Sequence, residues 1–423
     1  MTSPTPRSVF LFWVPLAATW LMMAIEGPTL AAVLARLADP TYNLAAYGVA
    51  FAFAILVEAP VIMLMSASTA LAGDAESLRR LRVFSWGLNV LATGLLLIVL
   101  IPPVYAFLMT TLMGLPDPVS ELTYGALWLL LPWPAAIGYR RFLQGLLIRS
   151  GRTRLVAAGT VLRLIAMGGS AIAFALLTDL PGASVGAVAL SVAVCVEAVA
   201  ARVMAAPTLR ELGATPPKDP TSVPSYGGIA RFYYPLALTS LIGLTVQPLL
   251  TFFMGRAPAP LESLAVFPVV HALSFVFRSF GLSYQEAAIA LLGPRNEHHR
   301  LMARFGLWLG FGTSAALAMV AFTPLADVWF VQISGLSPEL AEFAIWPTRI
   351  LVPLPALSVW LSLQRAVLVQ GRRTSPISGA TTVEVLGIAL LFPLFGFGLG
   401  WVGVTAAFVA FVGARFAGNL YLL

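Results

Sequence analysis

The run PTLRELGATPPKDPTSVPSY, from Pro207 to Tyr226, is the least hydrophobic long stretch of a chain otherwise dominated by apolar segments. It lies near the middle of the 423 residues, and the sequence on its two sides follows one plan. Tyr234-Pro235-Leu236-Ala237 repeats Val14-Pro15-Leu16-Ala17 at an offset of 220 in the numbering (234 − 14), and Pro248 follows Pro28 at the same offset. The stretch therefore indicates a join between two copies of one plan.

The composition excludes a soluble globular protein. The chain is 59% hydrophobic and 10% charged, whereas about a quarter of the residues of a soluble domain are charged. Apolar segments of about 20 residues recur, each long enough to cross the roughly 30 Å hydrocarbon layer as a helix. The first, Val9 to Ala35, is too long for a signal peptide and is interpreted as a span. We expect an all-α polytopic membrane protein, and the single Cys195 allows no intrachain disulfide.

Twelve spans are predicted, at about 9–36, 44–72, 83–108, 122–147, 155–178, 184–206, 228–255, 261–292, 302–331, 340–369, 376–397 and 401–421. Basic residues gather in alternate loops: Arg79, Arg80, Arg82, Arg149, Arg152, Arg154, Arg210, Lys218, Arg295, Arg300, Arg372 and Arg373. The other loops are acidic, with Arg36 and Arg256 as their only bases. This alternation predicts the cell (inner) membrane, with both termini and the join in the cytoplasm. The net charge of +7 is explained by orientation, and no nucleic-acid partner is expected.

The doubling extends along the halves. Leu44-Ala45-Ala46-Tyr47-Gly48 and Leu264-Ala265-Val266-Phe267-Pro268 again differ by 220 in the numbering (264 − 44), and Pro132-x-Pro134 precedes Pro353-x-Pro355 by 221 (353 − 132). Because each half has an even number of spans, the repeat is parallel, which is a transporter architecture. We predict two six-helix bundles, 1–206 and 227–423, joined by a cytoplasmic linker, 207–226, that gives the bundles slack to rock. Matched prolines suggest bent gating helices, although membrane helices carry more proline in any case.

Four charged residues within the spans are interpreted as structural ion pairs. Arg163 and Glu384 are repeat mates at an offset of 221 (384 − 163), and Glu197 and Arg415 occupy nearly matched places in the sixth and twelfth spans. Each half could therefore hold one bridge, Arg163–Glu197 and Glu384–Arg415, with the signs reversed. Paired charges satisfy each other in a medium that cannot solvate them.

The remaining charged residues of the spans are candidates for function, because ionisable groups at bilayer depth are costly. His271 and Arg278 are seven residues apart and share one helical face, and Arg278 is the repeat mate of Glu58. One interpretation is a salt bridge that closes the two halves together. The other is a cavity with a basic wall for an anion and a carboxylate that carries a coupling proton. The candidates are Arg278, His271, Arg349 and Gln247 for substrate, and Glu58 and Glu26 for coupling or gating.

No sequence pattern points to enzymatic chemistry. The chain has no HExxH, no paired-cysteine metal spacing and no Walker sequence. We therefore expect no catalytic residues, no metal and no cofactor.

Several segments resemble the MATE-like (multidrug/oligosaccharidyl-lipid/polysaccharide) exporter superfamily, and within it most nearly the progressive ankylosis family. They are Phe12-Trp13-Val14-Pro15-Leu16, Leu44-Ala45-Ala46-Tyr47-Gly48, Arg141-Phe142-Leu143-Gln144-Gly145 with Gly151-Arg152, Phe232-Tyr233-Tyr234-Pro235-Leu236-Ala237-Leu238, Phe267-Pro268-Val269-Val270-His271 and Trp346-Pro347-Thr348-Arg349-Ile350. The resemblance implies an exporter in which two bundles alternate access. Its animal members are associated with efflux of pyrophosphate, nucleotide triphosphate and citrate, and His271 and Arg349 stand at matching positions.

The expectation is a monomeric secondary transporter that exports small organic or phosphorylated anions, coupled to protons or sodium. One rival is a multidrug or lipid-linked oligosaccharide flippase of the same superfamily. The arginines count against cationic drugs but would suit a lipid pyrophosphate. A rival of another class is a membrane scaffold or enzyme without transport, which predicts that all the charges are paired.

Overall fold

The computed structural model describes residues 5–217, 223–293, 296–371 and 375–423. Lys218, Arg295, Arg372 and Arg373, which contributed to the predicted loop charges, lie outside the described residues. Every regular element within these ranges is a helix, which confirms the all-α class. Among them, eleven helices are long and apolar enough to cross a membrane. The fourth predicted span, 122–147, is divided between two shorter helices that meet near Pro132.

The elements of the first half are α1 (Pro6–Ala24), α2 (Glu26–Leu34), α3 (Pro40–Glu58), α4 (Leu64–Leu71), α5 (Ala75–Val99), α6 (Pro102–Ala106), the π-helix η1 (Phe107–Leu112), α7 (Asp117–Leu129), α8 (Trp133–Arg149), α9 (Thr153–Leu177), α10 (Gly182–Met204) and α11 (Ala206–Gly213). Those of the second half are α12 (Tyr226–Leu244), α13 (Val246–Met254), α14 (Pro260–Leu291), α15 (His299–Phe322), α16 (Leu325–Asp327), the π-helix η3 (Val328–Ile333), α17 (Pro338–Ile350), α18 (Leu354–Gln370), α19 (Ser375–Phe392), the π-helix η4 (Pro393–Gly398) and α20 (Gly403–Tyr421).

The doubling seen in the sequence is present in the helix bounds. The elements α12, α13 and α14 begin at an offset of 220 from α1, α2 and α3 (226 − 6, 246 − 26 and 260 − 40), and η3, α17 and α18 begin at an offset of 221 from η1, α7 and α8 (328 − 107, 338 − 117 and 354 − 133). Uncommon backbone conformations recur at the same offsets. Asp39 and its repeat mate Ala259 have φ of 48° and 53°, and Gly114 and its repeat mate Gly335 have φ of 68° and 75°. The repeat therefore includes details of the backbone.

Prolines interrupt several of these helices. The α1–α2 break at Ile25 and the α12–α13 break at Thr245 each precede a proline three residues later, Pro28 and Pro248. A proline within a helix removes one backbone hydrogen bond and bends the chain. The two halves differ elsewhere, because α3 and α4 are separated at Pro60 whereas α14 is one helix of 32 residues.

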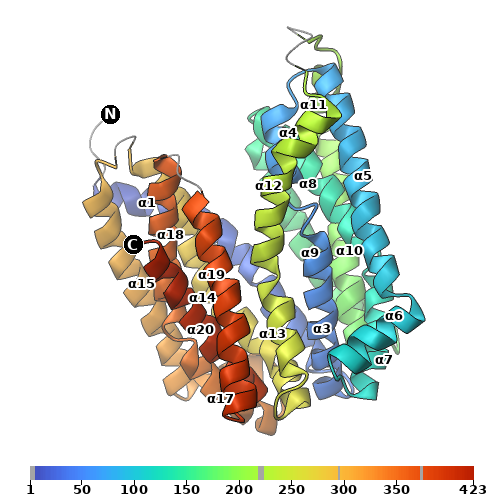
Figure 1. Cartoon of the computed structure of the whole chain (residues 1–423), viewed down its shortest axis with the longest axis vertical. Helices are drawn as coiled ribbons and strands as arrows, with labels where there is room; N and C mark the ends of the chain where they lie inside the picture. The colour runs from blue at the N-terminus through green and yellow to red at the C-terminus, as the bar shows by residue number, and fades with distance from the viewer. Residues whose placement is uncertain (1–4, 218–222, 294–295, 372–374) are drawn as a thin grey trace. The chain divides into compact units, whose positions relative to one another are not determined.

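The chain forms two compact units that do not coincide with the sequence halves. We call residues 49–248 the central unit, and residues 1–48 with 249–423 the outer unit. The first helix of each half therefore belongs with the remaining helices of the other half, whereas the sequence predicted bundles at 1–206 and 227–423. In Figure 1 the dark blue α1 lies among the yellow to red helices of the outer unit. The repeat and the compact units are different divisions of the chain.

Aromatic side chains fix α1 within the outer unit. The indole nitrogen of Trp13 donates a hydrogen bond of 2.9 Å to the Ser283 hydroxyl of α14, and its ring lies 5.7 Å from that of Phe305 on α15. Further along α1, Trp20 donates to the Glu286 carboxylate at 3.0 Å. Trp13 joins a buried cluster that includes Tyr284. These contacts explain why α1 packs against α14, since buried indoles find hydrogen-bond partners.

Part of the predicted linker is folded. Residues Ala206–Gly213 form α11, and Thr208 is buried. Arg152, which follows α8, donates to Thr208 at 2.9 Å and to the Glu211 carboxylate at 2.6 Å. The Thr215 carbonyl accepts a hydrogen bond from Ala75 at the start of α5. The expectation of slack throughout 207–226 is therefore wrong for 207–217, because these hydrogen bonds hold α11 within the central unit.

Candidate functional site

The outer unit contains a half-buried cluster of cationic and aromatic side chains around Phe411 of α20. The Arg278 guanidinium of α14 lies 5.1 Å from the centroid of the Phe411 ring, and that of Arg415 lies 5.4 Å from it. The imidazole of His271 stacks on Phe267 at 5.5 Å, with 25° between the ring planes, and lies 6.4 Å from Phe411. The seven-residue spacing on α14 places His271 and Arg278 on one helical face, and both side chains lie near the same phenylalanine.

Arg415 and Glu384 form one of the two predicted ion pairs. The Arg415 Nη2 and Nε donate to the two Glu384 oxygens at 2.6 and 2.8 Å, so the pair is bidentate. Glu384 is buried on α19, which packs against α20. A planar guanidinium matches a carboxylate in this geometry, and each partner satisfies the other away from water.

Arg365 is a third arginine of the same cluster. It comes from α18 and lies within electrostatic range of both Arg415 and Glu384. Its Nη2 donates a long hydrogen bond of 3.4 Å to the Thr381 hydroxyl, and its buried Nε has no partner among the described residues.

The cluster carries more positive than negative charge. Three arginines, Arg278, Arg365 and Arg415, share Glu384 as the carboxylate within their electrostatic range. Arg278 forms no hydrogen bond or salt bridge within its own unit, as far as the described residues show. A guanidinium has five donors and cannot lose its proton. The arrangement is therefore suited to accept a negatively charged group beside Phe411.

The central unit has a different cluster around Glu197 of α10, which is fully buried. Arg140 of α8 donates to Glu197 Oε2 in a very short contact, and Gln144 donates to Oε1 at 3.1 Å. Arg163 Nε lies 3.4 Å from Oε2, so the second predicted pair is also within salt-bridge distance. Sequence reasoning missed Arg140 because it lies close to the basic loop after α8. The spacing of Arg140 and Gln144, one helical turn on the same face, was the available signal.

Glu58 and Arg141 are neighbours of this cluster without being ion-paired to each other. The carboxylate of Glu58, buried at the end of α3, accepts a hydrogen bond of 2.7 Å from the Trp133 indole. Arg141 lies within electrostatic range of Glu58, and its Nη1 contacts the Met65 sulfur at 3.8 Å. Arg141 thus has no carboxylate partner in the described part of the central unit. Sequence reasoning missed this residue as a charge within a span.

The predicted pairing of Glu58 with Arg278 stays a prediction. The two residues belong to different units, and each has its own contacts there: Glu58 with Trp133, and Arg278 with Phe411.

The other predicted residues have different described surroundings. Arg349 of α17 donates from Nε to the Ala321 carbonyl at 3.1 Å, and its guanidinium lies 5.1 Å from the Phe322 ring. It therefore contacts the end of α15. Gln247 is the second residue of α13, in the central unit.

Glu26 opens α2 and lies within electrostatic range of the buried Tyr47. Its neighbour Gly27 faces α14, where an added Cβ would lie 3.0 Å from the Ala272 Cβ. The helix that carries Glu26 therefore passes close to α14 beside His271. No group of three or more potential metal ligands is present among the residues that the structure describes.

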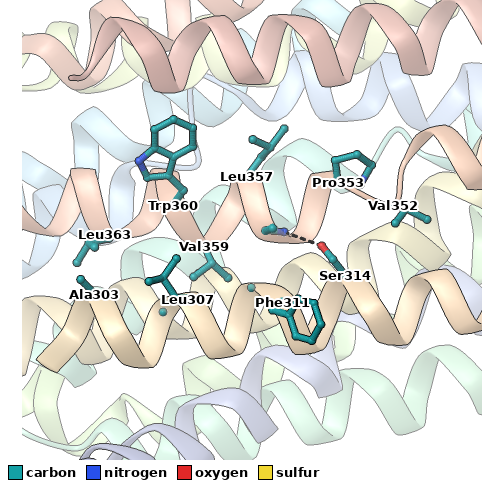
Figure 2. Close-up of a pocket in the computed structure, with 13 residues that line it drawn as sticks. Ala303, Leu307, Phe311, Ser314, Val352, Pro353, Leu357, Val359, Trp360 and Leu363 are labelled. Carbon is teal, nitrogen blue, oxygen red and sulfur yellow. Dashed lines mark hydrogen bonds between the residues drawn. The ribbon is translucent and has the colours of Figure 1, made fainter. Parts of the chain in front are cut away.

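A large groove on the outer unit has no charged lining. It lies between α15 and α18, has a volume of about 660 Å³, and is shown in Figure 2. Its main polar group, the Ser314 hydroxyl, already accepts a hydrogen bond from the Ala356 amide at 3.1 Å. Leu307 and Phe311 of its rim are 75% and 69% exposed, as expected for side chains that face lipid. The groove is thus unsuited to an anion.

Solved structures with this helix arrangement are transporters. A multidrug resistance MATE family transporter of the MOP superfamily, in an inward-facing conformation, is 16% identical over 95% of this chain and 92% of that one, with a TM-score of 0.68. The lipid II flippase MurJ is 14% identical over 97% and 87%, with a TM-score of 0.70. The MATE multidrug transporter DinF-BH is 11% identical over 99% and 95%, also with a TM-score of 0.70. The chain has the MATE-like fold.

Sequence comparison alone does not reach this conclusion, since no model of a protein family and no curated protein matches the chain. At 11–16% identity the likeness shows the fold, and the residues of the two charged clusters must be interpreted from their own geometry. In this MATE-like chain each compact unit has an arginine, Arg278 or Arg141, without a carboxylate partner in its own unit among the described residues.

Proposed function

We propose that the protein is a secondary active transporter of the membrane that exports small organic or phosphorylated anions. The observation that carries this proposal is the Arg278 guanidinium, held over Phe411 beside an arginine that already has its glutamate. A charge within an apolar span is strongly disfavoured without a counter-ion. A carboxylate or phosphate would supply that counter-ion and match the guanidinium fork with two parallel hydrogen bonds.

The surrounding residues have supporting roles in this proposal. Phe411 fixes the guanidinium of Arg278, and the Arg415–Glu384 pair can exchange partners when an anion arrives. His271 presents an imidazole on the same side of α14. Arg349 and Gln247, predicted as substrate ligands, are assigned to a different stage of transport, because Arg349 contacts the end of α15 and Gln247 belongs to the central unit. The resemblance to the progressive ankylosis family favours the citrate, pyrophosphate and nucleotide class.

Coupling is assigned to Glu58 and Glu26 in the same proposal. Glu58 is buried, and it pairs with an indole rather than an arginine. A carboxyl group in such surroundings can take up a proton during the cycle. The proposal includes alternating access by two helix bundles, a monomer in the inner membrane, and both termini in the cytoplasm, as the loop charges predict.

A second candidate is supported by one of the structural neighbours. MurJ is a lipid II flippase, and a lipid-linked pyrophosphate would suit the same arginines. A multidrug exporter of cations is less compatible, because it would have to bind beside three arginines. A scaffold without transport predicts that every buried charge is paired, and Arg278 counts against it.

Flux into proteoliposomes tests the proposal. The panel consists of citrate, pyrophosphate and a nucleotide triphosphate, with a fluorescent lipid-linked pyrophosphate as the rival substrate. Arg278→Ala should abolish anion movement, whereas Arg79→Ala, at an exposed i,i+3 ion pair, should leave it unchanged. Movement of the lipid alone would establish the second candidate. No protein-dependent movement of any of the soluble anions would refute the anion class.

A further inference from the structure

A second cavity of the outer unit differs from the groove of Figure 2 because a cation stands at one end. Its volume is about 570 Å³, within the range of roughly 300–1,000 Å³ that ligand pockets occupy. Its walls come from the bent α1–α2 helix, from Val276 of α14, and from Trp329 and Ile333 of η3. The lining is apolar apart from Thr29, whose hydroxyl bonds to the Ile25 carbonyl, and Arg36.

Arg36 lies two residues beyond the end of α2 and is exposed. Its Nη1 donates to the Ala32 carbonyl at 2.7 Å, and its Nη2 donates to the carbonyls of Gln332 and Ile333 at 2.7 and 2.9 Å. These three bonds use three of the five donors of a guanidinium. The two remaining N–H groups have no acceptor among the described residues. The guanidinium is therefore fixed in place and still able to bind an anion.

The dimensions of the cavity match an acyl chain that follows α2. Leu21 and Arg36 both line it, and the stretch of helix between them rises about 22 Å at roughly 1.5 Å per residue. Half of a bilayer's hydrocarbon layer is about 15 Å thick. Arg36 also lies just past the end of the candidate span Pro6–Leu34, which is the level of lipid phosphates. Arg36 at headgroup level would bind an anionic headgroup, and the apolar cavity beside it is long enough for an acyl chain. The site is therefore complementary to an anionic lipid.

We propose that this cavity binds one anionic phospholipid, with its phosphate on Arg36 and one acyl chain along α2. The proposal is independent of the transported substrate, because none of the residues around Phe411 (His271, Arg278, Arg365, Glu384 and Arg415) lines the cavity. The groove between α15 and α18 is the natural comparison within the same unit. It has a similar volume and an apolar lining, but it lacks a cation and should not distinguish headgroups.

Native mass spectrometry of the full-length protein provides the test. The protein is delipidated in detergent and supplied with phosphatidylglycerol or phosphatidylcholine of identical chains, in the absence of transported anions. Both lipids carry the phosphate, but the choline ammonium of phosphatidylcholine cancels its charge. One arginine beside the headgroup, at about 1 kcal/mol, therefore predicts about fivefold preference for the anionic phosphatidylglycerol. Arg36→Gln should remove the preference, and Ala32→Phe should block binding of either lipid by filling the channel. Ala303→Phe makes the same change in the other groove and should alter neither result.

Two controls keep the outcome decisive. Ala32→Phe keeps the backbone carbonyl that Arg36 uses, so its unfolding temperature should stay near that of the wild type. Millimolar inorganic phosphate should not displace the lipid, since the acyl chain supplies most of the buried surface. Equal binding of the two lipids by the wild type, or undiminished binding by folded Ala32→Phe, would overturn the proposal. Loss of anion flux with retained lipid binding, or the reverse, separates it from the proposed transport function.

Discussion

The guanidinium of Arg278 lies 5.1 Å from the ring centroid of Phe411, and the ring also receives Arg415 at 5.4 Å. One aromatic side chain therefore positions two cations. Arg415 is paired with Glu384, whereas Arg278 has no carboxylate partner among the described residues of the outer unit. A cation–π contact contributes about 0.5–2 kcal/mol, depending on its desolvation. The Phe411 ring thus fixes the position of the Arg278 guanidinium and of its N–H donors.

Replacing this ring should weaken anion binding without removing the charge. Phe411→Leu loses both cation–π contacts, and we expect the KM for the transported anion to rise about fivefold to tenfold. Phe416→Leu, on the same helix but paired with Trp360, is the matched control and should leave KM unchanged. Concentration-dependent flux measures both. An equal effect of the two substitutions would mean that the ring acts only through helix packing.

The buried Glu384–Arg415 pair gives a stability prediction. Glu384→Gln leaves Arg415 without its counter-ion and should lower the free energy of unfolding by about 3–5 kcal/mol. The double variant Glu384→Leu with Arg415→Met removes both charges and should recover most of that loss. Denaturant unfolding in detergent measures the difference. A double variant as unstable as the single one would show that the pair is not the source of the effect.

Arg140 and Arg141 are adjacent in sequence, but substitution of Arg140 should lower stability whereas substitution of Arg141 should lower anion flux. Arg140→Ala removes the nearest partner of the buried Glu197 and should destabilise the protein by about 3–5 kcal/mol. Arg141→Ala breaks no ion pair and should change stability by less than about 1 kcal/mol while lowering anion flux. Thermal unfolding and flux, measured on the same preparations, compare them. A stable Arg140→Ala variant would contradict the assignment of Glu197 to that arginine.

Coupling through Glu58 predicts a specific defect. Glu58→Gln keeps the size of the side chain but cannot exchange a proton. We expect it to abolish the stimulation of flux by an imposed pH gradient while flux without a gradient persists. Trp133→Phe, which removes the hydrogen bond to the carboxylate, should reduce the stimulation only partly. Stimulation of Glu58→Gln equal to that of the wild type would assign coupling elsewhere, with Glu26 as the next candidate.

Gly335 has a left-handed backbone conformation and little room for a Cβ. Its φ is +75°, and an added Cβ would lie 2.7 Å from Nη1 of Arg36. Gly335→Ala should therefore lower the free energy of unfolding by about 1–3 kcal/mol. The control Gly312→Ala, in α15 with nothing within 4 Å, should stabilise by up to about 1 kcal/mol. Differential scanning fluorimetry in detergent distinguishes the two, and equal shifts would contradict the role of the Arg36 contact.

Hydropathy and repeat spacing were sufficient to predict the helical class, the doubling of the helix bounds and the Glu384–Arg415 pair. Each depends on properties that are periodic along the chain. The neighbourhood of Glu197 could not be predicted in full, because Arg140 is separated from it by 57 residues and lies near a basic loop. The packing of α1 against α14 depends on specific side-chain pairs, such as the hydrogen bond from the Trp13 indole to the Ser283 hydroxyl. Hydropathy alone does not determine which of several equally apolar helices α1 packs against.

The division of the chain has a mechanical consequence. The backbone passes from one compact unit to the other at only two peptide bonds, after Gly48 and after Pro248. Both lie inside helices, α3 and α13, whereas the described parts of the polar run, 207–217 and 223–226, belong to the central unit. One boundary thus follows a residue without a side chain and the other follows a residue without an amide hydrogen, and we expect flexing of these two helices to accompany any relative motion of the units. We expect the hinge at these two helices, and not at 207–217 or 223–226 of the polar run.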